Sequence, residues 1–261
     1  MDLKLTDKVA LITGTGSQIG FGKGIACFLA KEGCDVISVD VDLEGAEKTA
    51  EEVKQLGCRA IAVKADITKR AEVDNAVEKA LEGFGRIDIL VNNAGRGTGR
   101  RPFTTTTEEQ WDIDINTNLK GTLNFTHAVL PHMLERKYGK IVNFSTHAAH
   151  QSSGLPGITP YIAAKAGVAM LSKNLAGEVG ASGININVVA PGPGATNFYY
   201  ASGDPRKMVD FVESIAEKGM ATTPEDIANT VAFLVSDVSK KLNGQVLEVS
   251  GITGGSSVAE D

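Results

Sequence analysis

The chain has 261 residues and a net charge of −6, with 42% hydrophobic and 22% charged residues. This composition is typical of an α/β protein with a sizeable core, and the acidic balance disfavours nucleic acid as a partner. Residues 1–8 are polar and no apolar run reaches the length of a membrane span, so we expect no membrane partner. Three cysteines without CxxC spacing are expected to be reduced thiols, which predicts a cytoplasmic location.

Short apolar runs alternate with amphipathic segments along the whole chain. Strands are expected at 8–13, 35–40, 59–64, 87–91, 140–144, 185–189 and 245–249. Helices are expected at 25–30, 43–56, 70–84, 107–132, from 160 onward and at 223–234. The fourth of these helices opens with a capping box at Thr107–Gln110. This alternation predicts one domain over 1–261, with a Rossmann-type, doubly wound parallel sheet of about seven strands and helices on both faces.

A glycine-rich turn, 14–24, follows the first expected strand and precedes a helix. Glycines such as Gly20 and Gly22 let a backbone approach a pyrophosphate, and a helix N-terminus supplies N–H donors. Glycines also form ordinary tight turns, but Asp40 ends the second strand at the distance expected of a ribose-binding carboxylate. Such a group accepts both ribose hydroxyls of NAD and repels the 2′-phosphate of NADP; otherwise it caps a helix or is solvated. We therefore expect NAD to be preferred over NADP.

Tyr161 and Lys165 are four residues apart in an Ala-rich helix that opens with Pro160. At this spacing the phenol and the ammonium project from one helix face. The cation stabilises the phenolate and brings the tyrosine pKa toward the working range of an acid–base catalyst. The same pair is more often a packed ring beside a solvated amine, so the pair by itself is weak.

In combination, these motifs make the chain similar to the short-chain dehydrogenase/reductase family along its whole length. The other matching motifs are Thr13-Gly14, Asp66, Asn92-Asn93-Ala94-Gly95, Asn118, and Pro191-Gly192 with Thr196. The resemblance implies a Rossmann fold, hydride transfer between a nicotinamide cofactor and a secondary alcohol or ketone, and commonly a homotetramer.

The resemblance also implies roles for individual residues. The catalytic set is Asn118, Thr146, Tyr161 and Lys165, in which Thr146 donates a hydrogen bond to the substrate oxygen and Tyr161 exchanges its proton. Lys165 holds the nicotinamide ribose, and Asn118 anchors Lys165 through a water or a backbone group. The cofactor-binding residues are Gly14, Gln18, Ile19, Gly20, Phe21, Gly22, Asp40, Asp66, Ile67, Asn93, Ala94, Gly95, Tyr161, Lys165, Pro191, Gly192 and Thr196.

Two departures from the family pattern affect this assignment. Five residues, 15–19, separate Thr13-Gly14 from Gly20-Phe21-Gly22, where the family usually has three; an ungapped alignment instead puts Gln18 at a glycine position. We prefer the insertion, because the helix start after Gly22 then matches the family. The catalytic hydroxyl is the second departure, since alignment from the strand selects Thr146 but Ser145 lies beside it.

Substrate contacts are the least determined part of the sequence. The loop after Gly95 carries Arg96, Arg100 and Arg101, whose guanidinium groups could bind an anionic substrate or lie in solvent. His147 and Tyr199 are further substrate candidates, and Tyr199 lies in the insertion near 198–219 where the family has its substrate lid. His147 and His150 have no third ligand at metal-binding spacing, so no metal is expected. Two alternatives to an NAD-dependent oxidoreductase of secondary alcohols remain, an NADPH-dependent 3-oxoacyl thioester reductase and a non-catalytic dinucleotide-sensing protein.

Overall fold

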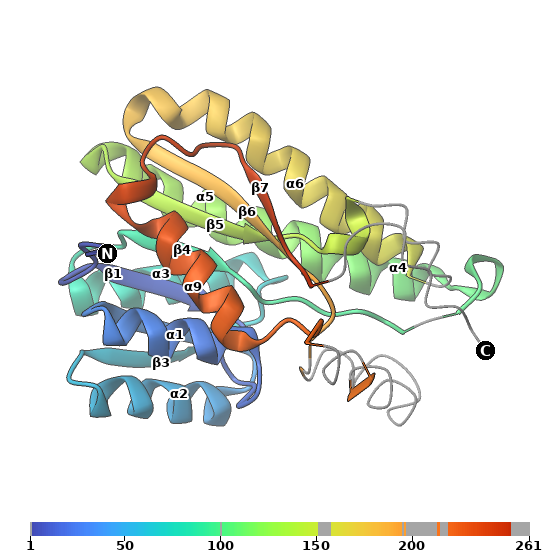
Figure 1. The fold of residues 1–261 in the computed structure, drawn as a ribbon, viewed down its shortest axis with the longest axis horizontal. Helices are drawn as coiled ribbons and strands as arrows, with labels where there is room; N and C mark the ends of the chain where they lie inside the picture. The colour runs from blue at the N-terminus through green and yellow to red at the C-terminus, as the bar shows by residue number, and fades with distance from the viewer. Residues whose placement is uncertain are drawn as a thin grey trace.

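The computed structural model describes residues 2–99, 101–150, 158–194, 196, 213–214 and 219–251. Their centre is one parallel sheet of seven strands in the order β3-β2-β1-β4-β5-β6-β7 (Figure 1). The strands are β1 (Val9–Thr13), β2 (Asp35–Asp40), β3 (Ala60–Lys64), β4 (Ile89–Asn92), β5 (Gly139–Phe144), β6 (Ile184–Pro191) and β7 (Val246–Val249). The predicted fold class is confirmed.

Helices cover both faces of this sheet, as the alternation predicted (Figure 1). The helices are α1 (Phe21–Lys31), α2 (Leu43–Gln55), α3 (Arg70–Phe84), α4 (Glu108–Ile115), α5 (Gly121–Arg136), α6 (Thr159–Val179) and α9 (Pro224–Val235). One hydrophobic core lies between the sheet and α1, α2 and α9, and a second lies between the sheet and α3, α5 and α6. Strands buried on both faces read as continuous apolar runs, which is why their ends were predictable to within about two residues.

The long helix expected from Thr107 to His132 is present but carries a turn that the sequence did not predict. Thr107 and Gln110 form the capping box at its start. Residues Asn116–Lys120 then form a π-helical turn between α4 and α5. A π turn widens the helix by one residue, and such turns occur frequently at functional sites. Here it contains Asn118, whose side chain is fully buried.

Because all seven strands run in the same direction, their carboxyl ends meet at one edge of the sheet. Thr13, Asp40, Asn92, Phe144 and Pro191 end β1, β2, β4, β5 and β6. In open α/β sheets, ligands bind at this edge, near the point where the strand order reverses. Here the order reverses between β1 and β4.

Two further findings concern regions outside this sheet. Among the helices of the described residues, none combines the length and apolarity needed to cross a bilayer. The substrate lid predicted near 198–219 lies almost wholly outside the described residues.

Candidate active site

The glycine turn between β1 and α1 forms a cradle of backbone atoms. Gly14 adopts a positive φ of 77°. A Cβ on Gly22 would lie 2.1 Å from the Gly14 carbonyl oxygen, so only glycine lets helix and turn approach this closely. Gly20 is the N-cap of α1 and offers no side chain to the first helical N–H groups. Those donors and the positive end of the helix fit a pyrophosphate.

The close contact at Gly22 supports the alignment with two extra residues in the loop. Gln18, the alternative glycine position, instead donates hydrogen bonds from Nε2 to the carbonyls of Gly16 and Gly45. Its neighbour Ile19 is 48% exposed. The inserted residues therefore fold outward over the start of α2. Gly20, Phe21 and Gly22 remain at the N-terminus of α1.

Asp40 lies beside this cradle at the end of β2. Its carboxylate accepts hydrogen bonds from the backbone N–H groups of Gly16 (2.7 Å) and Asp42 (2.9 Å). A carboxylate has about four acceptor sites, so two remain for ribose hydroxyls. The bond to Gly16 fixes the carboxylate against the loop, and the charge is half-buried where the ribose of a dinucleotide would lie.

The opposite wall of the cradle comes from the segment after β4. Asn93 donates from Nδ2 to the carbonyls of Thr13 and Gly14, and the Ala94 N–H donates to Thr13 Oγ1. Gly95 follows, and a Cβ there would lie 2.8 Å from Asn118 Oδ1 and 3.3 Å from Lys165 Nζ. This segment therefore connects the glycine turn to Asn118 and Lys165.

Asp66 and Ile67, predicted to flank the adenine, follow β3 at the same edge. Asp66 Oδ1 accepts from both the N–H and the hydroxyl of Thr68. Ile67 is 9% exposed and packs on Gly121, where a Cβ would lie 2.5 Å from its Cδ1. Asp66 is therefore held by the hydrogen bonds of its own turn, and Ile67 is held by its contact with α5.

Lys165 is the most buried cation of the site. Its side chain is 4% exposed, its Nζ donates to the Phe144 carbonyl (2.9 Å), and Nζ lies 5.9 Å from the centre of the Tyr161 ring. Burial lowers the pKa of Lys165 to about 8. Tyr161 is also buried, one helical turn earlier on α6. The spacing in the sequence has thus brought phenol and ammonium to the end of β5.

Asn118 connects the π turn to the segment after β4. Its Nδ2 donates to the carbonyls of Arg96 (2.6 Å) and Asp114 (2.8 Å), and its Oδ1 accepts from the Arg96 N–H (3.3 Å). All its amide groups are therefore engaged with backbone. Asn118 thus bonds to the neighbouring loop from within a π turn, a feature that occurs frequently at functional sites.

Ser145 and Thr146 have different surroundings. Ser145 is 3% exposed; its Oγ donates to the Lys165 carbonyl and contacts His150 Nε2 at 2.9 Å. Thr146 is half-buried, and its hydroxyl has no hydrogen-bond partner among the described residues. Ser145 thus holds the catalytic helix in place, whereas Thr146 has a hydroxyl to offer a substrate.

The remaining cofactor candidates follow β6. The Gly192 N–H donates to the Val249 carbonyl of β7, and a Cβ on Gly192 would lie 2.4 Å from Ser250 Oγ. Thr196 is 7% exposed. Pro191 and Gly192 are therefore fixed against the last strand, at the edge where Phe144 and Lys165 lie.

Of the substrate candidates, the structure describes Arg96 and Arg101 in the loop after Gly95, and His147 after β5. His147 Nδ1 lies 2.7 Å from Glu248 Oε2 on β7, which ties the loop after β5 to the edge strand. Arg100 and Tyr199 lie outside the described residues.

Sequence reasoning missed three buried groups that support the site, Asn143, Ser172 and Asp114. Asn92 donates to Asn143, and Asn143 donates to Ser172, so β4, β5 and α6 are joined. A polar residue within an apolar strand, as at Asn143, was the available signal.

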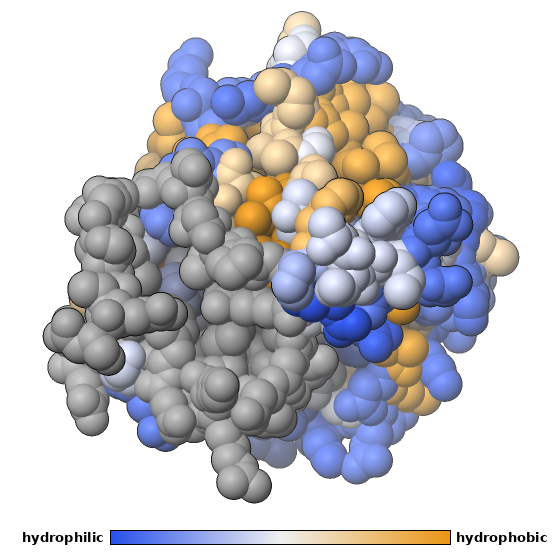
Figure 2. Space-filling model, turned by 90° about the vertical axis from the view of Figure 1, so that its right-hand side faces the viewer, coloured by the Kyte–Doolittle hydropathy of each residue, from blue (hydrophilic) through white to orange (hydrophobic). Residues whose placement is uncertain are grey.

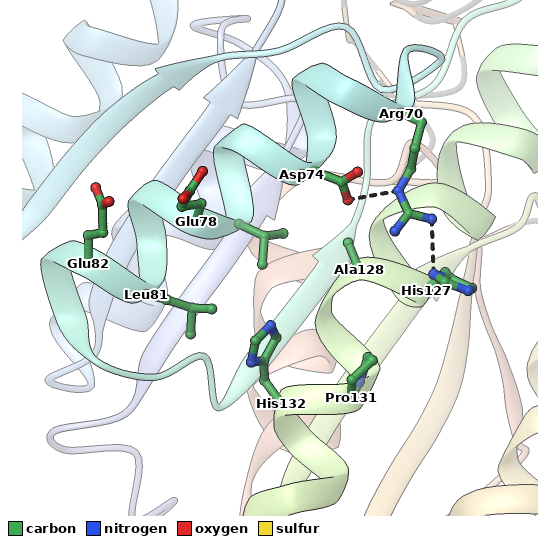
Figure 3. A pocket seen from close by; sticks show the side chains of 10 residues that line it. Arg70, Asp74, Glu78, Leu81, Glu82, His127, Ala128, Pro131 and His132 are labelled. Carbon is green, nitrogen blue, oxygen red and sulfur yellow. Dashed lines mark hydrogen bonds and ion pairs between the residues drawn. The ribbon is translucent and has the colours of Figure 1, made fainter.

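A groove of about 560 Å³ lies between α3 and α5, away from these residues (Figure 3). Val77, Leu81, Ala128 and Pro131 form its apolar part, with Arg70 hydrogen-bonded to His127 at one end. None of the sequence-predicted site residues lines it. We therefore place the active site at the carboxyl edge, not in this groove.

Comparisons with known proteins agree with this geometry. A family model described as Enoyl-(Acyl carrier protein) reductase matches residues 14–253. The (2S)-[(R)-hydroxy(phenyl)methyl]succinyl-CoA dehydrogenase subunit BbsD of Thauera aromatica is 43% identical over 95% of this chain and 96% of its own. The 3-oxoacyl-[acyl-carrier-protein] reductase FabG of Thermotoga maritima is 37% identical over 95% of this chain and 98% of its own.

Solved structures are equally similar. The 3-ketoacyl-(acyl-carrier-protein) reductase from Brucella melitensis, complexed with NADH, has a TM-score of 0.85 and 37% identity over 95% of this chain and 98% of its own. Levodione reductase has a TM-score of 0.86 and 33% identity over 98% of this chain and 99% of its own. The chain therefore belongs to the short-chain dehydrogenase/reductase family, and it is an oxidoreductase similar to the 3-oxoacyl reductases.

Proposed function

We propose that the protein is an NAD-dependent oxidoreductase that interconverts a secondary alcohol and a ketone. The observation that supports this most strongly is the buried Lys165 ammonium, one turn from Tyr161 and beside Gly95 of the cofactor wall. A dinucleotide-sensing protein without catalysis has no need of a buried cation, whose desolvation costs stability. The bound nicotinamide supplies the hydride acceptor or donor.

The residues of the site divide the proton chemistry between them. Thr146 donates a hydrogen bond to the substrate oxygen, and Tyr161 takes the proton of the alcohol or returns it to the ketone. The positive charge of Lys165 stabilises the phenolate of Tyr161. Asn118 positions the loop at Gly95, so the ammonium and the cofactor wall keep a fixed separation.

A thioester substrate is the class that the relatives suggest. BbsD is named for a hydroxyl group on a succinyl-CoA, and FabG for a 3-oxoacyl group on a carrier protein. Both substrates carry the reacting oxygen on an acyl thioester. We propose a 3-hydroxyacyl or 3-oxoacyl thioester as the substrate, with NADPH-dependent reduction as the second candidate function.

We further propose a homotetramer located in the cytoplasm. Exposed apolar side chains on α4, α5 and α6 include Ile115 (42%), Leu123 (42%) and Met170 (65%). Figure 2 views the end of the molecule at the right of Figure 1 and shows hydrophobic side chains over its upper half. Such surface favours association with further copies. Cys27, Cys34 and Cys58 are free thiols, which supports a reducing compartment.

Replacing Tyr161 with Phe is expected to lower kcat by at least about 100-fold, because only the proton relay is lost. NAD binding, followed by fluorescence titration, should change little.

Thr146→Ala should lower kcat with little effect on the melting temperature. Ser145→Ala removes a buried bond to the Lys165 carbonyl and should lower stability by about 1–3 kcal/mol. A larger loss of kcat in Ser145→Ala than in Thr146→Ala would show that Ser145 is the catalytic hydroxyl.

Asp40→Asn tests the cofactor preference. The amide keeps an acceptor for the Gly16 N–H but removes the negative charge that repels a 2′-phosphate. Because hydrogen bonds to charged groups contribute about 1.5–3 kcal/mol, the NAD-to-NADP ratio of kcat/KM should fall at least about tenfold. Glu44→Gln, at an exposed position on α2, is the matched control. A parent enzyme that uses both cofactors equally, or prefers NADP, contradicts the proposal.

Lys165→Met should inactivate the enzyme and stabilise the fold. Burial depresses the folded-state pKa to about 8 against an ordinary value of 10.5, so the charged form destabilises the folded chain below pH 8. This penalty disappears as pH rises from 8 to 10.5, where the unfolded chain alone still binds the proton. The variant should gain roughly 3 kcal/mol at pH 7 and less at pH 10 in denaturant unfolding. Exposed Lys173→Met is the control, and an equal gain at both pH values would count against the assignment.

Met170→Glu tests the assembly, because a carboxylate buried between copies lacks a partner. Sedimentation at micromolar concentration should show tetramers for the parent and smaller species for this variant. Leu56→Glu, at the C-cap of α2 where the side chain is 42% exposed, should leave the assembly unchanged. A monomeric parent would refute the homotetramer.

A further inference from the structure

The loop that follows Gly95 is held by a buried carboxylate whose purpose the reaction does not explain. Asp114, on α4, is 3% exposed, and its two oxygens accept the N–H (3.0 Å) and the hydroxyl (3.1 Å) of Thr98. A buried carboxylate costs free energy, and burial raises the pKa of Asp114 against the lowering by Thr98, Arg96 and Arg101. An apolar residue would fill this position of α4 without that cost.

The two hydrogen bonds between Asp114 and Thr98 determine where Arg101 lies. Gly99, with a φ of 97°, turns the chain back, and Arg101 Nη2 donates to the Thr98 carbonyl at 3.0 Å. Thr98 is thus bound on one side by Asp114 and on the other by Arg101. Since Asn118 holds Arg96 at the start of the same loop, the loop is fixed at both ends relative to the catalytic helix turn.

Arg101 also has an unused donor. Its Nε is buried and has no hydrogen-bond acceptor among the residues that the structure describes. An unsatisfied buried donor costs about 1–3 kcal/mol, so a ligand that supplied an acceptor would regain this amount. Asp114 does not serve, because its oxygens bond to Thr98 and neither lies within hydrogen-bond distance of Nε. Nε and an adjacent Nη of one guanidinium form a fork that matches a carboxylate.

We infer that Arg101 is a specificity-determining residue that binds a carboxylate on the acyl part of the substrate, and that Asp114 is the positioning residue that holds it through Thr98. The loop starts beside Lys165 and continues outward along α4 (Figure 1), so the carboxylate lies several atoms from the reacting carbon. This inference rests on the proposed function for the identity of the reaction, and it concerns only the choice of substrate.

Two 3-oxoacyl N-acetylcysteamine thioesters of equal length test it, one ending in a carboxylate and the other in its methyl ester. Neither contains a phosphate. The parent should favour the carboxylate at least about tenfold in kcat/KM, mainly through KM, as expected for one charge-assisted fork. Arg101→Gln should bring the ratio of the two substrates close to 1, and Arg101→Lys should restore part of it. Arg59→Gln, at the opposite edge of the sheet, should leave the ratio unchanged.

Asp114→Ala separates positioning from simple destabilisation. Loss of folded enzyme lowers kcat/KM for both thioesters equally, whereas displacement of Arg101 lowers the ratio between them. A parent ratio near 1, or a ratio unaffected by Arg101→Gln, overturns the inference, while turnover of the methyl ester still supports the proposed oxidoreductase. Calorimetry measures the affinities for both thioesters without turnover, and their ratio should show the same preference for the carboxylate. Failure of the proposed reaction can therefore be distinguished from failure of the proposed substrate preference.

The coenzyme A thioester of the methyl ester distinguishes a second source of negative charge. Arg101→Gln could lower kcat/KM for this compound and leave the carboxylate preference of the N-acetylcysteamine pair intact. In that case Arg101 binds the carrier phosphates, and the assignment to an acyl carboxylate is wrong. We expect the reverse result.

Discussion

The buried ammonium of Lys165 is the group around which the rest of the site is arranged. It reaches the end of β5 because its Nζ donates a hydrogen bond to the Phe144 carbonyl and because Ser145 Oγ donates to the backbone carbonyl of the same lysine. These two bonds set the depth and rotation of α6, and therefore the place of Tyr161. The Asn92–Asn143–Ser172 chain repeats this connection about two turns further along α6. The helix that carries Tyr161 is thus fixed by polar bonds as well as by apolar packing, which gives it one orientation.

The same edge of the sheet imposes a constraint of space on the cofactor loop. Gly14 and Gly22 approach so closely that a single methyl group would separate α1 from β1. That approach is what directs the first N–H groups of α1 to a point above the strand ends. The two extra residues of this loop leave the approach unchanged, because Gln18 ties them to Gly45 on the neighbouring helix. Loop length can therefore vary where the chain is exposed, while the glycine contacts cannot.

Most of the fold could be predicted from the sequence, and the reason is the chemistry of parallel strands. Runs such as 35–40 are mostly apolar on both faces and bounded by glycine or aspartate, so the number of strands and their positions along the chain could be predicted. Helix α3 was predicted with its observed bounds. The π turn at Asn116–Lys120 was not, because its residues suit an ordinary helix and only the bond from Asn118 to Arg96 favours the widened turn. The partners of His147 and Ser145 depend on residues 101 and 20 positions away, and local pattern carries no such information.

Asp114 illustrates a difference between residues that stabilise a fold and residues that specify a site. Its carboxylate is buried on a helix whose other inward residues could be apolar, and it leaves a neighbouring arginine with an unsatisfied donor. Both features lower stability in the absence of a ligand. Lys165 has the same character, since burial disfavours its charge. Natural sequences retain such local conflicts mainly at functional sites, where a ligand or a transition state relieves them. The two conflicts lie at opposite ends of one loop, which begins at Gly95 beside Lys165 and ends at Arg101. A substrate lying along that loop would therefore have its reacting oxygen near Tyr161 and Thr146 and its distant charge near Arg101.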